Sequence, residues 1–141
     1  MIEVCCAIIL NESKILVVQR GPKSSHPLEW EFPGGKVHPD ETIEQCIVRE
    51  IDEELNLKIE VKDQLLPVDF DYSTKQIRLI PLVCKIISGE ITLTEHIALH
   101  WIESDEWDKI KWSGADHALI AKNQEYLKWL LIKPIAPDVE K

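Results

Sequence analysis

The stretch Gly35–Leu57, GKVHPDETIEQCIVREIDEELNL, decides the fold and the chemistry expected of this chain. Its second half predicts a helix that carries three carboxylates, Glu50, Glu53 and Glu54. Spacings of three and four residues place such side chains on one side of a helix, where like charges repel unless a cation lies between them. Carboxylate oxygens suit Mg²⁺, which in turn suits a phosphate substrate. The helix therefore predicts a magnesium site.

Acidic helices more often form a solvated surface, so the direction of these carboxylates has to be tested. On a helical wheel of about 100° per residue, the three glutamates continue the side that Ile43, Cys46 and Ile47 form one turn earlier. Apolar residues mark the side that a packed helix turns inward, and Asp52 falls roughly opposite. Acids that point into a protein need a neutralising partner, so the wheel favours a metal site.

The ends of this helix and the loop before it are also marked in the sequence. Thr42, with Gln45 three residues later, has the pattern of a capping box and predicts a helix start near Ile43. Asn56 tolerates the left-handed conformation that ends many helices. The preceding Phe32–Gly35 contains two glycines, which allow backbone groups to approach a ligand closely.

The pattern of these residues resembles the Nudix box. Its matching positions are Gly35, Glu41, Arg49-Glu50-Ile51, Glu53-Glu54 and Asn56-Leu57. Asn56 stands where the family usually has glycine, a departure that affects only the helix end. Met1–Arg20, Trp30–Lys36 and the segment from Glu95 to Trp101 also resemble the MutT-like branch of the family.

The resemblance implies an α/β fold, the Nudix-type α/β/α sandwich with a mixed β-sheet. A chain of 141 residues has room for one ordinary core and no second domain. We expect a single Nudix hydrolase domain over residues 1–132 and a C-terminal tail over residues 133–141.

Other segments predict the remaining elements of such a fold. The expected strands are Val4–Leu10, Lys14–Gln19, Ile59–Phe70, Gln76–Ile87 and Ala98–Ile102. Pro81 suggests a bulge or an edge position in its strand. Ser104–Trp107 predicts an N-capped short helix, and Ala115–Leu131 predicts one amphipathic helix that Pro134 ends.

Composition narrows the class of partner. A net charge of −9 disfavours a protein that grips a nucleic-acid polymer through its backbone. The first residues lack a basic region and no apolar run approaches about 18 residues, so we expect neither a signal peptide nor a membrane span. The four cysteines, Cys5, Cys6, Cys46 and Cys84, have no CxxC spacing and predict buried thiols. We therefore expect a cytoplasmic protein that acts on a small-molecule nucleotide.

By the resemblance, the chain hydrolyses a nucleoside diphosphate linked to a further group, and the MutT-like branch typically takes nucleoside triphosphates to monophosphate and pyrophosphate. The implied metal ligands are Glu50, Glu53, Glu54 and the carbonyl of Gly34. The implied cofactor is Mg²⁺, with Mn²⁺ as the alternative. Arg49 is expected to orient a glutamate, and Glu41 to brace the junction between loop and helix, near Gly35.

Two acids compete for the role of general base: Glu50 in the box and Glu95 in the loop before the last strand. Arg20 resembles a residue that reaches the substrate phosphate or sugar, although an Arg at a strand end is more often a surface charge. Lys75 is a weaker candidate for a phosphate contact. The five histidines lack zinc spacing and are interpreted as incidental, with His96 notable only because it adjoins Glu95.

Recognition of the base is expected from Asp116, near the start of the last helix. An ionised carboxylate only accepts hydrogen bonds, which suits the exocyclic amine of cytosine, although guanine and 8-oxoguanine also offer an amine. The alternative role for Asp116 is a helix N-cap. Phe32 and Trp30 are either stacking surfaces for the base or parts of the core.

These expectations converge on a Mg²⁺-dependent nucleoside triphosphate pyrophosphohydrolase, with CTP or a modified dCTP as the favoured substrate. The alternatives are an 8-oxo-dGTP diphosphatase that sanitises the nucleotide pool, and an enzyme for ADP-ribose or another sugar-linked diphosphate. A Nudix-fold binding domain without catalysis is a third. Such domains commonly lose box glutamates, which this chain retains.

Overall fold

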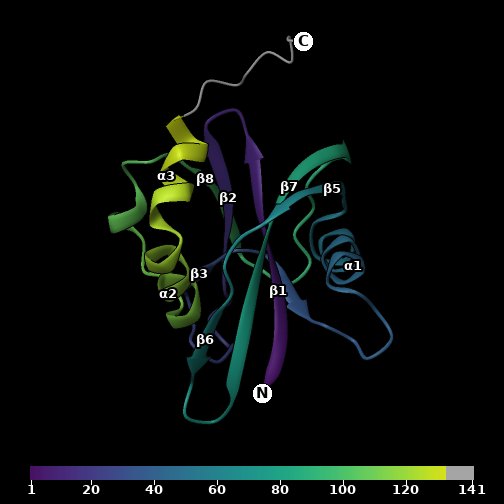
Figure 1. The fold of residues 1–141 in the computed structure, drawn as a ribbon, viewed down its shortest axis with the longest axis vertical. Coiled ribbons are helices and arrows are strands. Elements are labelled where there is room, and N and C mark those ends of the chain that lie inside the picture. Colours follow the sequence, from purple (N-terminus) through teal and green to yellow (C-terminus); the bar gives the residue numbers. More distant parts are fainter. Residues whose placement is uncertain (133–141) are drawn as a thin grey trace.

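A computed structural model describes residues 1–132, which form one mixed β-sheet between two layers of helices (Figure 1). The strands are β1 (Ile2–Asn11), β2 (Lys14–Gln19), β3 (Trp30–Glu31), β4 (Gly34–Lys36), β5 (Leu57–Gln64), β6 (Val68–Asp71), β7 (Gln76–Gly89) and β8 (Ala98–Ile102). The helices are α1 (Ile43–Leu55), α2 (Gly114–Lys122) and α3 (Gln124–Ile132), with a 3₁₀ turn, η1, at Trp107–Lys109. The expected tail and Pro134 lie outside the described residues.

Strand β1 organises the sheet. It pairs in parallel with β7 and antiparallel with both β2 and β4, so the sheet is mixed, as predicted. Successive side chains of a strand point to opposite faces. Accordingly, Cys5, Ala7 and Ile9 pack against α1, whereas Cys6 and Ile8 pack in the cluster that contains residues of α2 and α3.

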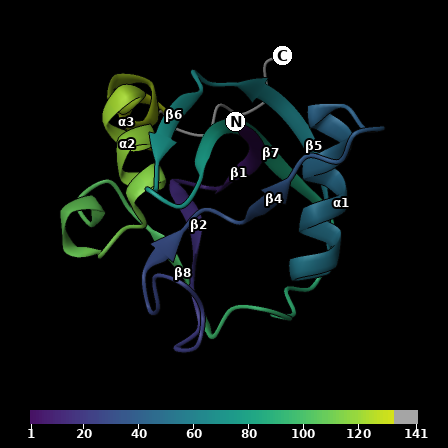
Figure 2. The same cartoon turned by 90° about the horizontal axis from the view of Figure 1, so that it is seen from below.

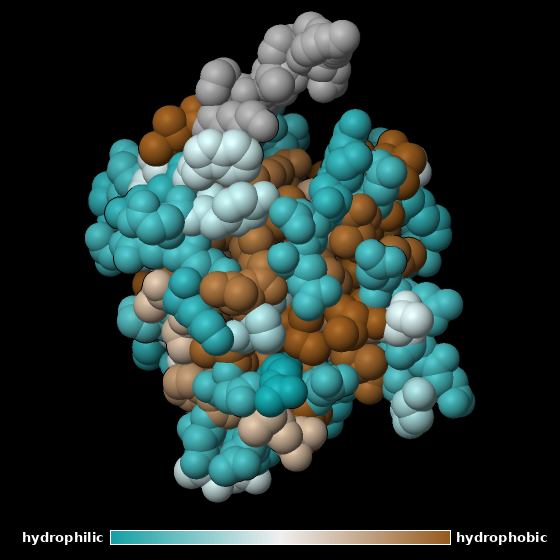
Figure 3. Space-filling view, in the orientation of Figure 1, coloured by the Kyte–Doolittle hydropathy of each residue, from teal (hydrophilic) through white to brown (hydrophobic). Residues whose placement is uncertain are grey.

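The two helix layers lie on opposite faces of the sheet when the molecule is viewed from below (Figure 2). In the space-filling view, hydrophobic residues gather over the middle of the molecule, between the two layers, with hydrophilic residues around them (Figure 3). All four cysteines are buried and free, which confirms that prediction. Among the helices of residues 1–132, none has both the length and the apolar character needed to cross a membrane.

Helix α1 begins and ends where the sequence predicts. The Thr42 hydroxyl accepts from the Gln45 backbone N–H at 3.0 Å, and the Gln45 side chain accepts from the Thr42 N–H at 2.9 Å. Asn56 adopts the left-handed conformation, with φ 60° and ψ 37°. Local capping therefore sets where this helix begins and ends.

The expected strand Ile59–Phe70 is wrong, because that stretch forms two strands, β5 and β6, which pair with successive parts of β7. Pro81 lies opposite the break between them, inside β7 and not at an edge of the sheet. Its carbonyl accepts from the Leu65 N–H at 2.9 Å. The proline nitrogen faces the same side as this carbonyl, so its missing N–H weakens no pairing with β1.

The expected single helix Ala115–Leu131 is also wrong, because it breaks at Asn123 into α2 and α3. The Asn123 side chain bonds both backbone groups of Leu66, accepting from its N–H and donating to its carbonyl, each at 3.0 Å. The short helix predicted at Ser104–Trp107 is the 3₁₀ turn η1, which starts later and has no side-chain cap. The contacts of Asn123 with the distant backbone of Leu66 therefore accompany the break between α2 and α3.

Candidate active site

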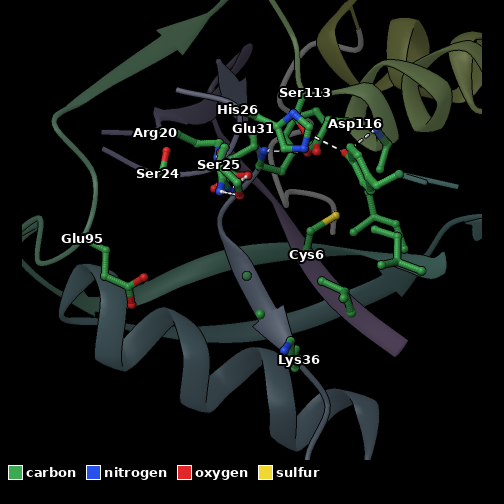
Figure 4. A pocket seen from close by; sticks show the side chains of 18 of the residues that line it. Cys6, Arg20, Ser24, Ser25, His26, Glu31, Lys36, Glu95, Ser113 and Asp116 are labelled. Atoms are coloured by element: carbon green, nitrogen blue, oxygen red, sulfur yellow. Dashed lines mark hydrogen bonds and ion pairs between the residues drawn. The ribbon is translucent and has the colours of Figure 1, made fainter. Parts of the chain in front are cut away.

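A cavity of about 430 Å³ lies where the loop after β2, strand β4, the end of α1 and the start of α2 meet (Figure 4). The predicted site residues that line it are Arg20, Phe32, Gly34, Gly35, Glu54, Lys75, Glu95 and Asp116. In Figure 4, Glu95 lies beside α1, while Arg20, Glu31 and Asp116 gather at the other end. The cavity thus has an end near the acidic helix and an end near α2.

Glu54 is the acid of the box that faces the cavity. Its side chain is buried, and Oε1 has no hydrogen-bond partner among the described residues. Burial, followed by a hydrogen bond with Glu50 and by the charge of Glu95, raises the pKa of Glu54 to about 10. A buried carboxyl oxygen without a partner, among further acids, fits a position for a divalent cation.

Glu50 and Glu53 are held by Arg49 and stand outside the cavity lining. Arg49 Nη1 lies 2.9 Å from Glu50 Oε2 and 3.2 Å from Glu53 Oε1. The Glu50 side chain is 13 % exposed, whereas that of Glu53 is 59 % exposed. The helical wheel is therefore right about Glu50 and Glu54 and wrong about Glu53, which reaches solvent at the rim of the buried side.

The contacts of Arg49 with Glu50 and Glu53 affect whether the predicted metal ligands stand together. Within residues 1–132, no three side chains of His, Cys, Asp or Glu stand together ready to hold a metal ion. Two of the predicted ligands, Glu50 and Glu53, instead contact the Arg49 guanidinium, whose positive charge offsets the repulsion between the carboxylates. Arg49 thus holds the acids near Glu54 in the conformation described.

Arg49 also ties the helix to the loop before it. Its Nε and Nη2 donate to the two carboxylate oxygens of Glu41 at 3.0 and 2.6 Å, and Nη2 donates to the Lys36 carbonyl at 3.2 Å. The Glu41 carboxylate also accepts from the His38 N–H at 2.8 Å. Arg49 lowers the pKa of Glu41 to about 2. These contacts are the ones expected of an orienting arginine and a bracing glutamate.

We predict that Arg49→Lys lowers kcat by about 10- to 100-fold, the usual cost of losing a group that orients metal ligands. A lysine has one ammonium group and cannot reach Glu41, Glu50 and Glu53 together. Steady-state kinetics across a titration with a divalent metal ion would measure this, and the half-saturating metal concentration is expected to rise. A variant with wild-type kcat would show that Arg49 does not orient these acids.

The two glycines of β4 allow the box to pack against the sheet. At Gly34, a Cβ atom would overlap the backbone of Cys5 and Cys6, with which β4 pairs. At Gly35, it would overlap the carboxyl group of Glu50. Gly34 is therefore required by the sheet, and Gly35 by the acid that Arg49 holds.

Asp116 lies at the other end of the cavity and is buried. Its Oδ2 accepts from the Phe32 N–H at 2.9 Å, and Ser113 occupies the N-cap position of α2, so the N-cap alternative for Asp116 is wrong. Burial, and then the charge of Glu31, raises its pKa well above the ordinary range. The sequence alone suggests an ionised carboxylate, whereas burial and the charge of Glu31 favour the neutral acid, which can also donate.

The two aromatic candidates differ in how they meet the cavity. Phe32 is buried and packs against Trp112 at 5.3 Å between ring centroids, so it belongs to the core while lining the cavity. Trp30 is half-buried, and its ring meets His100 edge-on. Trp30 is not part of the lining found among the described residues.

Sequence reasoning missed a polar network at this end of the cavity. Glu31 accepts from Arg20 Nη1 at 3.1 Å through one oxygen and contacts His96 Nε2 at 2.9 Å through the other. Arg20 also donates to the carbonyl and hydroxyl of Ser25. His96 is therefore not incidental. The only sequence signal for Glu31 is a charge between two aromatics in a strand, and nothing local links it to His96.

Of the remaining lining residues, Tyr72 and His26 carry no sequence signal for this site, whereas Lys75 is the predicted phosphate contact. The hydroxyl of Tyr72 bonds Ser113 and accepts from the Ala115 N–H, each at 2.8 Å, at the start of α2. His26, from the loop after β2, packs on Tyr72 with 5.0 Å between ring centroids. Lys75 is exposed, in the turn between β6 and β7. These groups add aromatic and polar surface to the end of the cavity that holds Asp116.

Comparisons with known proteins show what the chain is similar to. The NUDIX domain family model matches residues 1–131. The chain is 37% identical over 120 residues to a CTP pyrophosphohydrolase of Escherichia coli, covering 85% of this chain and 89% of that one. It is 31% identical over 121 residues to an 8-oxo-dGTP diphosphatase of Haemophilus influenzae, with 85% and 89% covered. The solution structure of the E. coli ORF135 protein matches with a TM-score of 0.77 and 33% identity, over 96% of this chain and 94% of that one.

Proposed function

Because the chain belongs to the NUDIX family and is a pyrophosphohydrolase of that family, we propose that its substrate is CTP or a modified dCTP and that its cofactor is Mg²⁺. Hydrolysis then gives a nucleoside monophosphate and pyrophosphate. The observation that carries the proposal is one cavity with buried Glu54 at one end and buried Asp116 at the other. Such a cavity suits a ligand with a charged phosphate end and a polar ring.

The metal would be held by Glu50, Glu53, Glu54 and the Gly34 carbonyl, all of them oxygen donors. Bound there, Mg²⁺ would supply positive charge to the phosphates and lower the pKa of a water molecule. The unpartnered oxygen of Glu54 supports this assignment. Mn²⁺ prefers similar donors and is expected to substitute.

Of the two candidates for general base, Glu95 is the one we propose. Glu50 Oε2 lies 2.9 Å from Arg49 Nη1, and the Glu50 side chain stands outside the cavity lining, where it is poorly placed to meet the attacking water. Glu95 is exposed and lines the cavity on the side of α1. Within reach of the phosphates, its carboxylate would take the proton of the attacking water.

Arg20 and Lys75 are proposed to bind phosphate or sugar. The guanidinium of Arg20 is held at the cavity by three hydrogen bonds to Glu31 and Ser25, which leaves two of its five N–H donors for a substrate. Lys75 stands on a neighbouring turn. Both would offset the phosphate charge away from the metal end.

For the base, we propose that neutral Asp116 donates to a ring acceptor of cytosine. Cytosine presents the ring nitrogen N3 as an acceptor beside its exocyclic amine. A carboxylic acid can donate to the first and accept from the second. The similarity to a CTP pyrophosphohydrolase supports cytosine. The similarity to an 8-oxo-dGTP diphosphatase keeps 8-oxoguanine as the second candidate, since guanine also offers an acceptor and donors.

We predict that Asp116→Asn retains kcat/KM for CTP within about threefold, because an amide reproduces the donor and acceptor of a neutral acid. Asp116→Ala is expected to lose about 10- to 100-fold, which corresponds to one unmade hydrogen bond and an unpaired Phe32 N–H. Steady-state kinetics at pH 7 would measure both. A large loss in Asp116→Asn alone would show that the ionised carboxylate is the recognising form.

A substrate screen tests the proposed function. Pyrophosphate release would be measured for CTP, 5-substituted dCTP and 8-oxo-dGTP, and hydrolysis of ADP-ribose would be followed in parallel, each with Mg²⁺, Mn²⁺ or EDTA. We expect the highest kcat/KM with a cytosine nucleotide and no turnover in EDTA. A preference for 8-oxo-dGTP would reverse the choice of base, and activity in EDTA would overturn the metal site.

The remaining expectations concern surroundings and partners. The enzyme acts on small nucleotides, and we propose that it binds neither nucleic-acid polymer nor membrane, in keeping with its net charge of −9. Four buried free thiols suit a reducing compartment, which supports the cytoplasm as its location. The single-domain boundary at residue 132 is likewise a proposal.

A further inference from the structure

The loop Thr94–Ile97 carries Glu95 and is tied to the fold on both sides of it. We propose that Thr94 and His96 are positioning residues that hold Glu95 over the acidic end of the cavity. The inference rests on the proposed function, because it assigns Glu95 to the reaction. Thr94 and His96 lie outside the Nudix box and are not among the proposed metal ligands.

Thr94 attaches the loop to the end of α1. Its hydroxyl is shared between the carbonyls of Glu53 and Glu54, at 3.2 and 3.3 Å, and its N–H donates to the Glu54 carbonyl at 3.3 Å. Carbonyls in the last turn of a helix lack partners within the helix. Thr94 therefore binds the backbone of the two acidic residues themselves, and the position of Glu95 is set relative to them.

His96 attaches the other side of the loop to the sheet. Its side chain is 7 % exposed, and Nε2 lies 2.9 Å from Glu31 on β3. The next residue, Ile97, donates its N–H to the carbonyl of Gln19 on β2 at 3.1 Å. Since the other oxygen of Glu31 holds Arg20, the His96 contact joins the loop to the proposed phosphate-binding arginine.

These two attachments restrict where the Glu95 carboxylate can lie. A glutamate on a loop has several rotatable bonds, and an exposed one samples many positions. Catalysis by proton transfer needs the carboxylate within hydrogen-bond reach of the water it activates, and a misplacement of about 1 Å can cost 10²-fold in rate. Fixing the backbone immediately before and after Glu95 limits that freedom.

The test combines conservative and disruptive variants. Thr94→Val removes the hydroxyl and His96→Ala removes the imidazole, whereas Thr94→Ser and His96→Gln keep a donor near the same place. We expect kcat for the best nucleotide to fall about 10- to 100-fold in the disruptive pair. KM should change less than about threefold in Thr94→Val and rise in His96→Ala, because Glu31 then holds Arg20 less firmly. The conservative pair is expected to recover most of kcat.

A second comparison separates positioning from a general loss of structure. In a Glu95→Gln background the base is already gone, so Thr94→Val and His96→Ala should lower kcat little further, which gives a strongly non-additive double-mutant cycle. His100→Gln is the matched control, since His100 makes the same kind of contact with Glu106 at 2.9 Å on exposed surface. It should leave kcat and KM unchanged.

The possible results separate the proposed function from the positioning role of Thr94 and His96. A wild-type protein that hydrolyses no nucleotide refutes the proposed function itself. Positioning is overturned if the wild type is active and either the disruptive variants keep full kcat or their losses add fully to that of Glu95→Gln. It is also overturned if Glu95→Gln retains wild-type kcat. Thermal unfolding of each variant verifies that the rate losses occur in folded protein.

Discussion

Replacing Glu54 by glutamine is expected to lower kcat by about three orders of magnitude, the largest effect we predict for a single substitution. Several kcal/mol of charge stabilisation are supplied by a catalytic metal, and each 1.36 kcal/mol is tenfold in rate. Glu54 is the box acid that is buried at the cavity with an unpartnered oxygen. Its neutral isostere leaves the cavity shape unchanged, so the loss reports the missing charge. Initial rates at saturating nucleotide and Mg²⁺ would measure it.

The same substitution is expected to stabilise the metal-free protein. Burial raises the pKa of Glu54 from 4.5 to about 10, so between these values the folded state keeps a proton that the unfolded state has lost. The free energy of unfolding then falls as pH rises through this window. A glutamine does not titrate, so the variant does not lose this stability. In EDTA, thermal unfolding at pH 5 and pH 8 should show a difference in Tm that grows with pH.

Glu44→Gln is the matched control for both measurements, because Glu44 is exposed in the first turn of the same helix. It should leave kcat and the pH dependence of Tm unchanged. Full activity of Glu54→Gln would remove this residue from the metal site. A lower Tm of Glu54→Gln at pH 8 would show that the ionised form of Glu54 is stabilised by a partner in the folded state.

Gly35→Ala is the second large effect, a loss of about 10²-fold in kcat. The added methyl group would overlap the Glu50 carboxyl and push it away from Arg49 and Glu54. Gly34→Ala provides the contrast, since its methyl group would meet the backbone of β1 and displace β4, so it should lower Tm as well as kcat, whereas Gly35→Ala should lower Tm little. Kinetics and thermal unfolding on both variants would separate them. Equal losses of Tm with intact kcat would mean that Gly35 serves only the fold.

The parts of the fold that the sequence predicts are those with local causes. The capping box of Thr42 and the left-handed Asn56 depend on neighbours within a few residues, and helix α1 follows them closely. The two wrong elements depend on distant backbone. Nothing within α2 announces that Asn123 bonds Leu66, 57 positions away, or that β7 will pair with two strands in succession.

The site divides in the same way. Helical periodicity alone predicts the burial of Glu50 and Glu54, and the box resemblance is confirmed by the family match over residues 1–131. Glu31 and His96 meet across 65 positions of chain, so no spacing rule could pair them. The raised pKa of Asp116 depends on burial and on the charge of Glu31, neither of which is visible until the chain is folded.

The position of the sheet between the two helix layers has an evolutionary consequence. Helix α1, with the acids, packs in one core cluster, whereas α2, with Asp116, borders the other. The two ends line one cavity, but the core residues that support them belong to separate clusters on opposite faces of the sheet. Descendants of one ancestor can diverge in the nucleotide they prefer while inheriting an unchanged cleavage reaction.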